Sequence, residues 1–143
     1  MDGATGLEAF ELTIRVAAAD VDQLGHVNNT VYLRWVQDVA IAHWQVLATP
    51  SLQAEIVWMV LRHEIDYKQP AWPDDELVLR TWVGEADGLR FDRHTQVLRA
   101  APRVLLAQAR TVWCPIDVRT GRPKRLPPAV RQLVSRPNPT QAR

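Results

Sequence analysis

Two aspartates, a glycine, a histidine and two asparagines lie close together in the chain, and their types and spacing suit acid–base chemistry. The segment reads Asp-Val-Asp-Gln-Leu-Gly-His-Val-Asn-Asn over residues 20–29. It precedes a predicted helix, whose first backbone N–H groups are unpaired and lie at its positive end. Such groups can stabilise a developing oxyanion while a carboxylate, Asp20 or Asp22, attacks a carbonyl carbon or activates water. In the structural alternative, both carboxylates only complement the helix dipole and form Asx turns.

Several other chemistries lack the residues that they need. The chain has two serines, Ser51 and Ser135, and neither lies in the Gly-x-Ser-x-Gly motif of a serine hydrolase. The six glycines are not spaced for a phosphate-binding or dinucleotide-binding loop. The four histidines form no i, i+4 pair and Cys114 is the single cysteine, so we expect no metal site. We expect no other cofactor, and we expect Cys114 to be a small buried apolar residue.

Composition narrows the class of protein further. The 143 residues suffice for one domain, and 47% apolar with 23% charged residues is typical of a globular chain. A net charge of +1 argues against binding to nucleic acid or to an anionic membrane surface. One cysteine excludes an internal disulfide, no apolar run could span a membrane, and residues 1–8 do not resemble a signal peptide. We therefore expect a soluble, cytoplasmic protein without membrane insertion.

The elements that would position the acidic segment can be predicted from periodicity. Alternating apolar residues over 10–16 predict a strand with one wet face. Asn28 and Asn29 are good N-caps, and the apolar residues that follow recur at helical spacing. This pattern predicts one long amphipathic helix over about 29–47, which ends before Pro50. The acidic segment is then the loop between the first strand and the helix.

The residue pattern in the rest of the chain predicts mostly strands. Hairpin-like connections, one with an Asp-Gly turn at 87–88, join most of them. We predict α+β architecture, with a mostly antiparallel five-stranded sheet covered by one dominant helix. One domain occupies residues 1–135, and residues 136–143 form a flexible tail. Because such a sheet leaves edges and apolar surface uncovered, we expect at least a dimer. The predicted strands are 56–68, 76–85, 89–99 and 103–116, and a short helix follows at 129–134.

The acidic segment also resembles a known signature. Hotdog-fold acyl thioesterases, both those similar to 4-hydroxybenzoyl-CoA thioesterase and the long-chain acyl-CoA and acyl-carrier-protein enzymes, carry a motif similar to Asp20-x-Asp22-x-x-Gly25-His26-Val27-Asn28-Asn29-x-x-Tyr32. Segments 64–71, 112–117 and 120–123 resemble later parts of these proteins in the same order, so the resemblance covers about 10–128. It implies a five-stranded sheet wrapped around one long helix. It also implies hydrolysis of an acyl-CoA or acyl-carrier-protein thioester to free acid and thiol.

The resemblance implies a role for each matching residue. Asp22 would be the catalytic carboxylate, either nucleophile or general base, and the backbone N–H of Asn29 would polarise the thioester carbonyl. His26 matches a family histidine that, in the plant enzymes, accompanies an asparagine two residues after the aspartate. Here Leu24 stands at that place, so His26 either takes part in catalysis or only positions the loop. The implied substrate-binding residues are Gly25, Asn28, Tyr32 and Arg90.

Other expectations concern charge, aromatic residues and assembly. Asp20 would shape the loop, and Asp38 would lie on a solvated helix face. The basic residues, Arg90 and a cluster at 119–125, would either contact CoA phosphates or be solvated surface. Six tryptophans could line an acyl tunnel or simply belong to the core. The family pairs protomers with active sites at the interface, which implies a homodimer or a dimer of dimers. The alternative function is a hotdog module that binds acyl thioesters without hydrolysing them.

Overall fold

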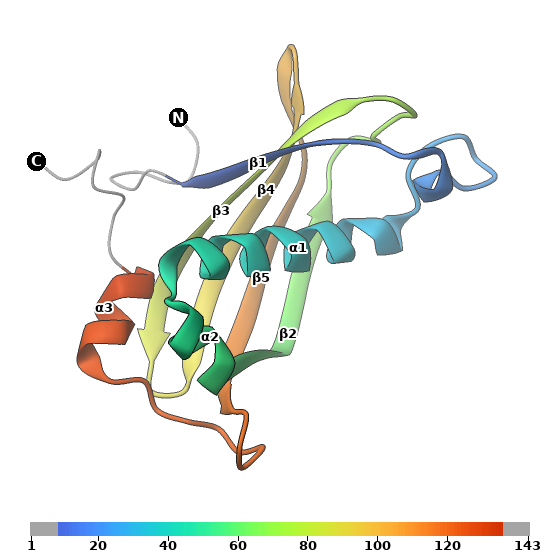
Figure 1. Cartoon of the computed structure of the whole chain (residues 1–143). Coiled ribbons are helices and arrows are strands. Elements are labelled where there is room, and N and C mark those ends of the chain that lie inside the picture. Colours follow the sequence, from blue (N-terminus) through green and yellow to red (C-terminus); the bar gives the residue numbers. More distant parts are fainter. Residues whose placement is uncertain (1–8, 136–143) are drawn as a thin grey trace, which may run out of the picture.

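The structure, a computed structural model, describes residues 9–135 as a curved sheet with one long helix across a face (Figure 1). All neighbouring strands are antiparallel, and the order across the sheet is β1-β3-β4-β5-β2. The predicted α+β class and the five-stranded sheet are therefore confirmed. The expected tail, residues 136–143, lies outside the described residues. The strands are β1 (Phe10–Arg15), β2 (Ile56–Tyr67), β3 (Glu76–Asp87), β4 (Arg90–Ala100) and β5 (Arg103–Asp117).

The long helix α1 (Asn29–Leu47) has the predicted bounds. Asn28 is its N-cap, and the Asn28 side chain accepts a hydrogen bond from the Thr30 N–H at 2.9 Å. Six residues of one helix face are buried, as the apolar spacing predicts. They are Tyr32, Trp35, Val36, Val39, Ala40 and Trp44.

A second, short helix was not predicted. Helix α2 (Pro50–Glu55) occupies the segment between the predicted long helix and the predicted strand that begins at residue 56. Pro50 ends the first helix but also begins the second, because proline fits the first helical turn, where its missing N–H is not needed. The Thr49 side chain caps this turn by accepting from the Leu52 N–H at 3.1 Å. The predicted C-terminal helix is present as α3 (Pro128–Ser135).

Two clusters of buried residues lie between α1 and the sheet. The first cluster surrounds the start of the helix and includes Tyr32, Val39 and Leu77. The second cluster surrounds its end and includes Trp44 and Phe91. The loop with the acidic segment therefore lies over one end of the sheet, and the hairpin between β3 and β4 lies at the other (Figure 1). Among the described helices none is long and apolar enough to cross a membrane.

Candidate functional site

The loop between β1 and α1 is folded tightly on itself. The Asp22 N–H donates to the His26 carbonyl at 3.0 Å, and the Gly25 N–H donates to the Asp22 carbonyl at 3.0 Å. Val21 and Val27 form an antiparallel bridge beside this turn. Gly25 has a φ of +87°, a conformation that residues with a Cβ rarely adopt. The glycine in the motif is therefore what allows the loop to reverse between the carboxylate and the histidine.

Asp20 anchors the loop to the helix. Asp20 is 6% exposed, and its Oδ1 accepts from Arg34 Nη2 at 2.9 Å. Its Oδ2 accepts from the Ala17 N–H at 3.2 Å, and its backbone carbonyl accepts from the Asn28 N–H at 3.0 Å. Both carboxylate oxygens are thus engaged, and Asp20 holds the loop in shape.

Asp22 differs from Asp20 because one of its carboxylate oxygens accepts no hydrogen bond from residues 9–135. Its side chain is half-buried, and Oδ1 accepts from the Leu24 N–H at 2.8 Å, which is the Asx turn of the structural alternative. Its Oδ2 has no hydrogen-bond partner within residues 9–135. Leu24 is 77% exposed and offers the carboxylate only its backbone. The arrangement leaves one oxygen of Asp22 available for a substrate or a water molecule.

The N–H of Asn29 is the second available group. The neighbouring N–H groups are occupied, because Asn28 donates to the Asp20 carbonyl and Thr30 donates to the Asn28 side chain. The Asn29 N–H has no acceptor in the part of the chain that the structure describes. The Asn29 carbonyl accepts from the Tyr67 hydroxyl at 3.0 Å, which fixes this first turn of α1 to β2. A free donor therefore stands at the positive end of the helix.

His26, within the loop, and Tyr32, in the first turn of α1, both help to hold the loop in place. The His26 ring packs edge-on against Trp72, with ring centroids 5.7 Å apart, and it makes no hydrogen bond to any described residue. Tyr32 is 2% exposed, and its hydroxyl accepts from the Ala71 N–H at 3.0 Å. Burial raises the pKa of Tyr32 above its usual value. The structure brings both residues to the loop, and their predicted contacts with substrate stay predictions.

Arg90 lies far from this loop within one chain. It begins β4 opposite Asp87 and is exposed. Its neighbour Phe91 belongs to the second cluster, whose helix residue Trp44 is about 22 Å along α1 from Asn29 at a rise of 1.5 Å per residue. The Arg125 guanidinium lies close to Gly88, at the tip of the same hairpin. Arg90 and Arg125 therefore lie at the opposite end of the sheet from the acidic loop.

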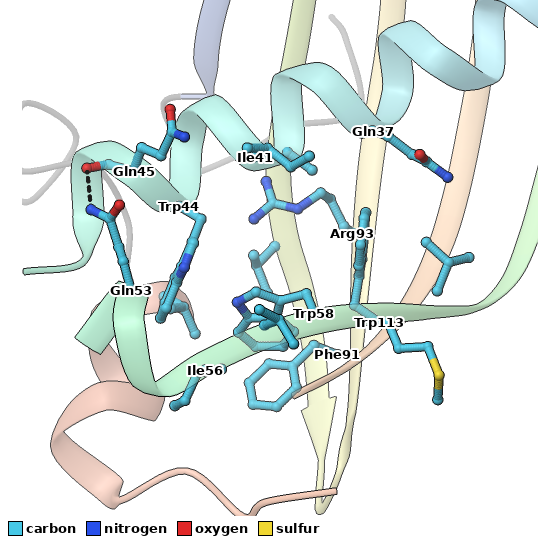
Figure 2. Close-up of a pocket in the computed structure, with 16 residues that line it drawn as sticks. Gln37, Ile41, Trp44, Gln45, Gln53, Ile56, Trp58, Phe91, Arg93 and Trp113 are labelled. Carbon is cyan, nitrogen blue, oxygen red and sulfur yellow. Dashed lines mark hydrogen bonds between the residues drawn. The ribbon is translucent and has the colours of Figure 1, made fainter. Parts of the chain in front are cut away.

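A large cavity, which the sequence analysis did not locate, opens between α1 and β2 (Figure 2). Its volume is about 580 Å³, and its lining is mostly apolar and aromatic. Of the six tryptophans, three line it and one, Trp35, belongs to the first cluster. Trp72 is exposed beside His26, and Trp82 stacks on His94. The three tryptophans of the lining also belong to or pack against the second cluster, and their contact with an acyl chain stays a prediction. The three in the lining are Trp44, Trp58 and Trp113.

The cavity also holds a charged residue, Arg93. Its Nη1 donates to His43 Nδ1 at 3.0 Å and to the Thr81 hydroxyl at 3.2 Å. Burial lowers the pKa of Arg93 to about 10, so the guanidinium stays charged at neutral pH. Burial and the nearby Arg93 charge lower the pKa of His43 to about 3, so the imidazole is neutral there. In the sequence, Arg93 alternates with Phe91 and Thr95 along its strand, and this spacing is the signal that could have placed it on the inner face.

Metal and thiol chemistry find no support in the described part of the chain. No group of three or more His, Cys, Asp or Glu side chains within residues 9–135 is arranged to hold a metal ion. Cys114 is buried, as expected, and burial raises the pKa of its thiol. A raised pKa disfavours the thiolate, which is the reactive form.

Comparisons with known proteins agree with this architecture. A 1,4-dihydroxy-2-naphthoyl-CoA thioesterase from Synechocystis superimposes with a TM-score of 0.76 at 20% identity, over 88% of this chain and 95% of that one. A probable thioesterase from Bartonella henselae gives a TM-score of 0.72 at 24% identity, over 84% of this chain and 99% of that one. These likenesses show a shared hotdog fold, as the sequence resemblance implies.

Sequence comparison extends beyond the fold. A chloroplastic acyl-[acyl-carrier-protein] hydrolase from Cuphea viscosissima is 23% identical over 93% of this chain. The chain spans about a third of the length of that relative, 34%. The family model of the thioesterase-like superfamily matches residues 16–134, which include the acidic loop, the helix and all of the sheet after β1. Because this model matches most of the chain, the chain belongs to the thioesterase-like superfamily.

Proposed function

We propose that this chain hydrolyses an acyl-CoA or acyl-carrier-protein thioester in the cytoplasm, with Asp22 as the catalytic carboxylate. The observation that carries the proposal is the pair of unoccupied groups at the loop, the Asp22 Oδ2 and the Asn29 N–H. The hydrogen bond from Asn28 to the Asp20 carbonyl joins the start of the helix to the backbone that bears Asp22. The two groups therefore stand on neighbouring backbone segments, where one thioester could meet both.

The chemistry follows from these two groups. The Asn29 N–H donates to the thioester carbonyl oxygen, and one such donor typically contributes about 3–4 kcal/mol as charge develops there. As a general base, Asp22 takes a proton from water, whose oxygen adds to the carbonyl carbon. The C–S bond then breaks and the thiolate receives the proton. As a nucleophile, Asp22 itself adds to the carbon and expels the thiolate. Water then hydrolyses the resulting anhydride, which restores the Asp22 carboxylate, and the proton released goes to the thiolate. Both routes yield one acid and one thiol.

His26 belongs to this proposal as a positioning residue. Its carbonyl accepts from the Asp22 N–H, and its ring packs on Trp72. Because its ring makes no hydrogen bond to the Asp22 carboxylate, we assign its effect to holding the loop that carries Asp22. Gly25 serves the same purpose by permitting the turn.

We propose further that a second copy of the chain pairs along β2, giving a homodimer. Strand β2 is at an edge of the sheet, and edge strands present unpaired backbone groups. Three apolar side chains of this strand are about half exposed, Val57 at 50%, Met59 at 47% and Leu61 at 42%. Ile41, on the facing side of the cavity, is 49% exposed. A second copy would cover these groups and the mouth of the cavity.

The alternative function is binding of a thioester without hydrolysis. One observation favours it: Leu24 gives Asp22 no polar side-chain partner, where the plant enzymes have an asparagine. The two functions differ in whether free thiol is released.

The test is release of thiol from a panel of acyl-CoAs and acyl-carrier proteins, followed with a thiol reagent. The wild-type chain should hydrolyse at least one substrate, and Asp22→Asn should lower its turnover at least about tenfold to a hundredfold. Asp38→Asn is the matched control, because Asp38 is an exposed carboxylate on the solvent face of α1. Equal turnover in wild type and a folded Asp22→Asn protein would reject the assignment. Binding without any thiol release would favour the alternative.

A further inference from the structure

Arg93 is a cation on the inner face of the sheet. It lies on β4 in a row of four buried residues that alternate along the strand, Phe91, Arg93, Thr95 and Val97. Phe91 and Val97 belong to the two clusters beneath α1, so the row faces the helix. Figure 2 shows the Arg93 side chain reaching from the strand toward α1, near Ile41. Arg93 is 8% exposed and lines the cavity.

The charge of Arg93 has no counter-ion in the described part of the chain. Its two hydrogen-bond partners are His43 and Thr81, which both accept from Nη1. Both side chains are uncharged at neutral pH. Its Nε and Nη2 make no hydrogen bond to any residue of 9–135. Among the described residues that line the cavity there is no aspartate or glutamate. An unpaired charge in an apolar setting is costly, and proteins usually pair or neutralise it.

The neighbouring polar groups do not relieve this charge. Trp58 and Trp113 line the same cavity, and the indole N–H of each is buried and has no acceptor among residues 9–135. These are donors as well, so they would oppose rather than offset a cation. Their nitrogen atoms are covered by surrounding atoms, whereas Arg93 keeps a small accessible surface. The cavity is therefore apolar over most of its lining and electropositive at one point.

We propose that the cavity binds the far end of an extended apolar acyl group that terminates in a carboxylate, with Arg93 as the group that recognises it. This substrate class rests on the proposed thioester hydrolysis and specifies it. A guanidinium can offer a carboxylate two parallel N–H donors, and Nε and Nη2 are the two that are unoccupied. The apolar and aromatic lining would hold the chain between the thioester and the carboxylate.

The position of the cavity along α1 fits an elongated group. The lining begins at Gln37, about 12 Å from Asn29 along the helix axis, and His43, the partner of Arg93, is about 21 Å from Asn29. An acyl group held by its carbonyl at the Asn29 N–H must therefore be long to place its other end at Arg93. A short acyl group would leave the cation unpaired.

The first experiment measures binding without relying on hydrolysis. Dodecanoate and dodecanol have the same chain, and only the acid is charged. Wild-type protein should bind dodecanoate about ten- to a hundredfold more tightly than dodecanol in calorimetric titration, the range of a charge-assisted hydrogen bond. Arg93→Met should abolish this difference. Arg93→Lys keeps the charge without the planar fork and should retain part of it. Arg15→Met, an exposed arginine on β1, should leave it intact.

Absence of any preference in wild type, or an equal preference in folded Arg93→Met, would overturn the inference. In that case Arg93 only ties the sheet to the helix, or a carboxylate of a second copy neutralises it. If Arg93→Met does not fold, the comparison between wild type and Arg93→Lys decides, because a preference unchanged by lysine also overturns the role of the guanidinium.

The second experiment measures thiol release from hexadecanedioyl-CoA and hexadecanoyl-CoA, which differ in the terminal carboxylate. Wild type should prefer the dicarboxylic thioester by about tenfold or more in kcat/KM, and Arg93→Met should reverse or abolish that preference. Hydrolysis of both at equal rates overturns the inference and leaves the proposed function standing. No hydrolysis of either, with acid-selective binding intact, overturns the proposed function and leaves the Arg93 site standing.

Discussion

The buried charged side chains near the two ends of helix α1 differ in whether they have a partner of opposite charge. At the loop end, Asp20 is 6% exposed and each of its carboxylate oxygens receives a donor. At the cavity end, Arg93 is 8% exposed and no carboxylate in the described chain meets it. A buried charge that is paired within the chain stabilises the fold. A buried charge without a partner can instead be stabilised by a bound ligand of opposite charge. The buried carboxylate at the loop end is thus paired within the described residues, and the buried guanidinium at the cavity end is not.

The largest expected effect is a loss of folding stability at low pH, caused by His43 at the cavity end of α1. The pKa of His43 is about 3 in the folded chain, below the ordinary 6.5, so the folded state binds fewer protons than the unfolded state between these values. The stability that His43 contributes is therefore complete above about pH 6.5 and is lost as the pH falls toward 3. Between about pH 6.5 and 4.5 the loss should be about 2–3 kcal/mol.

Urea unfolding across this range, in wild type and His43→Gln, measures that contribution. Glutamine offers Arg93 an acceptor that does not titrate, so the variant should lose less stability on acidification. Parallel curves for wild type and His43→Gln would contradict the assignment to His43.

The next prediction compares how the free energy of unfolding changes when one buried charge is removed near either end of α1. Asp20→Asn should lower the free energy of unfolding by about 1–3 kcal/mol, because it weakens the bonds to Arg34 and to the Ala17 N–H. Arg93→Met should be neutral or stabilising without ligand, because a buried unpaired charge is replaced by an apolar chain. Thermal or urea unfolding of the ligand-free proteins decides. Equal destabilisation by both variants would show that Arg93 is as well satisfied as Asp20.

The smallest effect uses two glycines with similar backbones. Gly25 in the acidic loop has φ +87° and Gly121 after β5 has φ +71°, and an added Cβ at either position meets nothing within 4 Å. Gly25→Ala and Gly121→Ala should therefore cost about 1 kcal/mol each, from backbone strain alone. Thiol-release assays should separate them, since only Gly25→Ala disturbs the turn that carries Asp22. Loss of kcat/KM in both, or in neither, would contradict the role of the loop.

The elements that are local in sequence were predicted well. The bounds of α1 followed from the asparagine cap and the helical spacing of its apolar residues, and the strands followed from alternation and from turn signals such as Asp87-Gly88. The miss at α2 has a specific cause. Pro50 was interpreted only as a stop, although a proline after Thr49 is also a good helix start.

What the sequence by itself determined is the acidic loop and the elements that flank it. The hydrogen bonds within the turn itself join close neighbours in the sequence, such as Asp22 with His26 and Gly25 with Asp22, so residue types and spacing suffice to predict a turn there. Only the tertiary structure decided the cavity and its cation. Arg93, His43 and Thr81 come from β4, α1 and β3, and they meet because the sheet order places those strands beneath the helix. A long-range pairing of this kind leaves no local pattern, because it depends on how the strands are ordered and not on which residues neighbour each other in the chain.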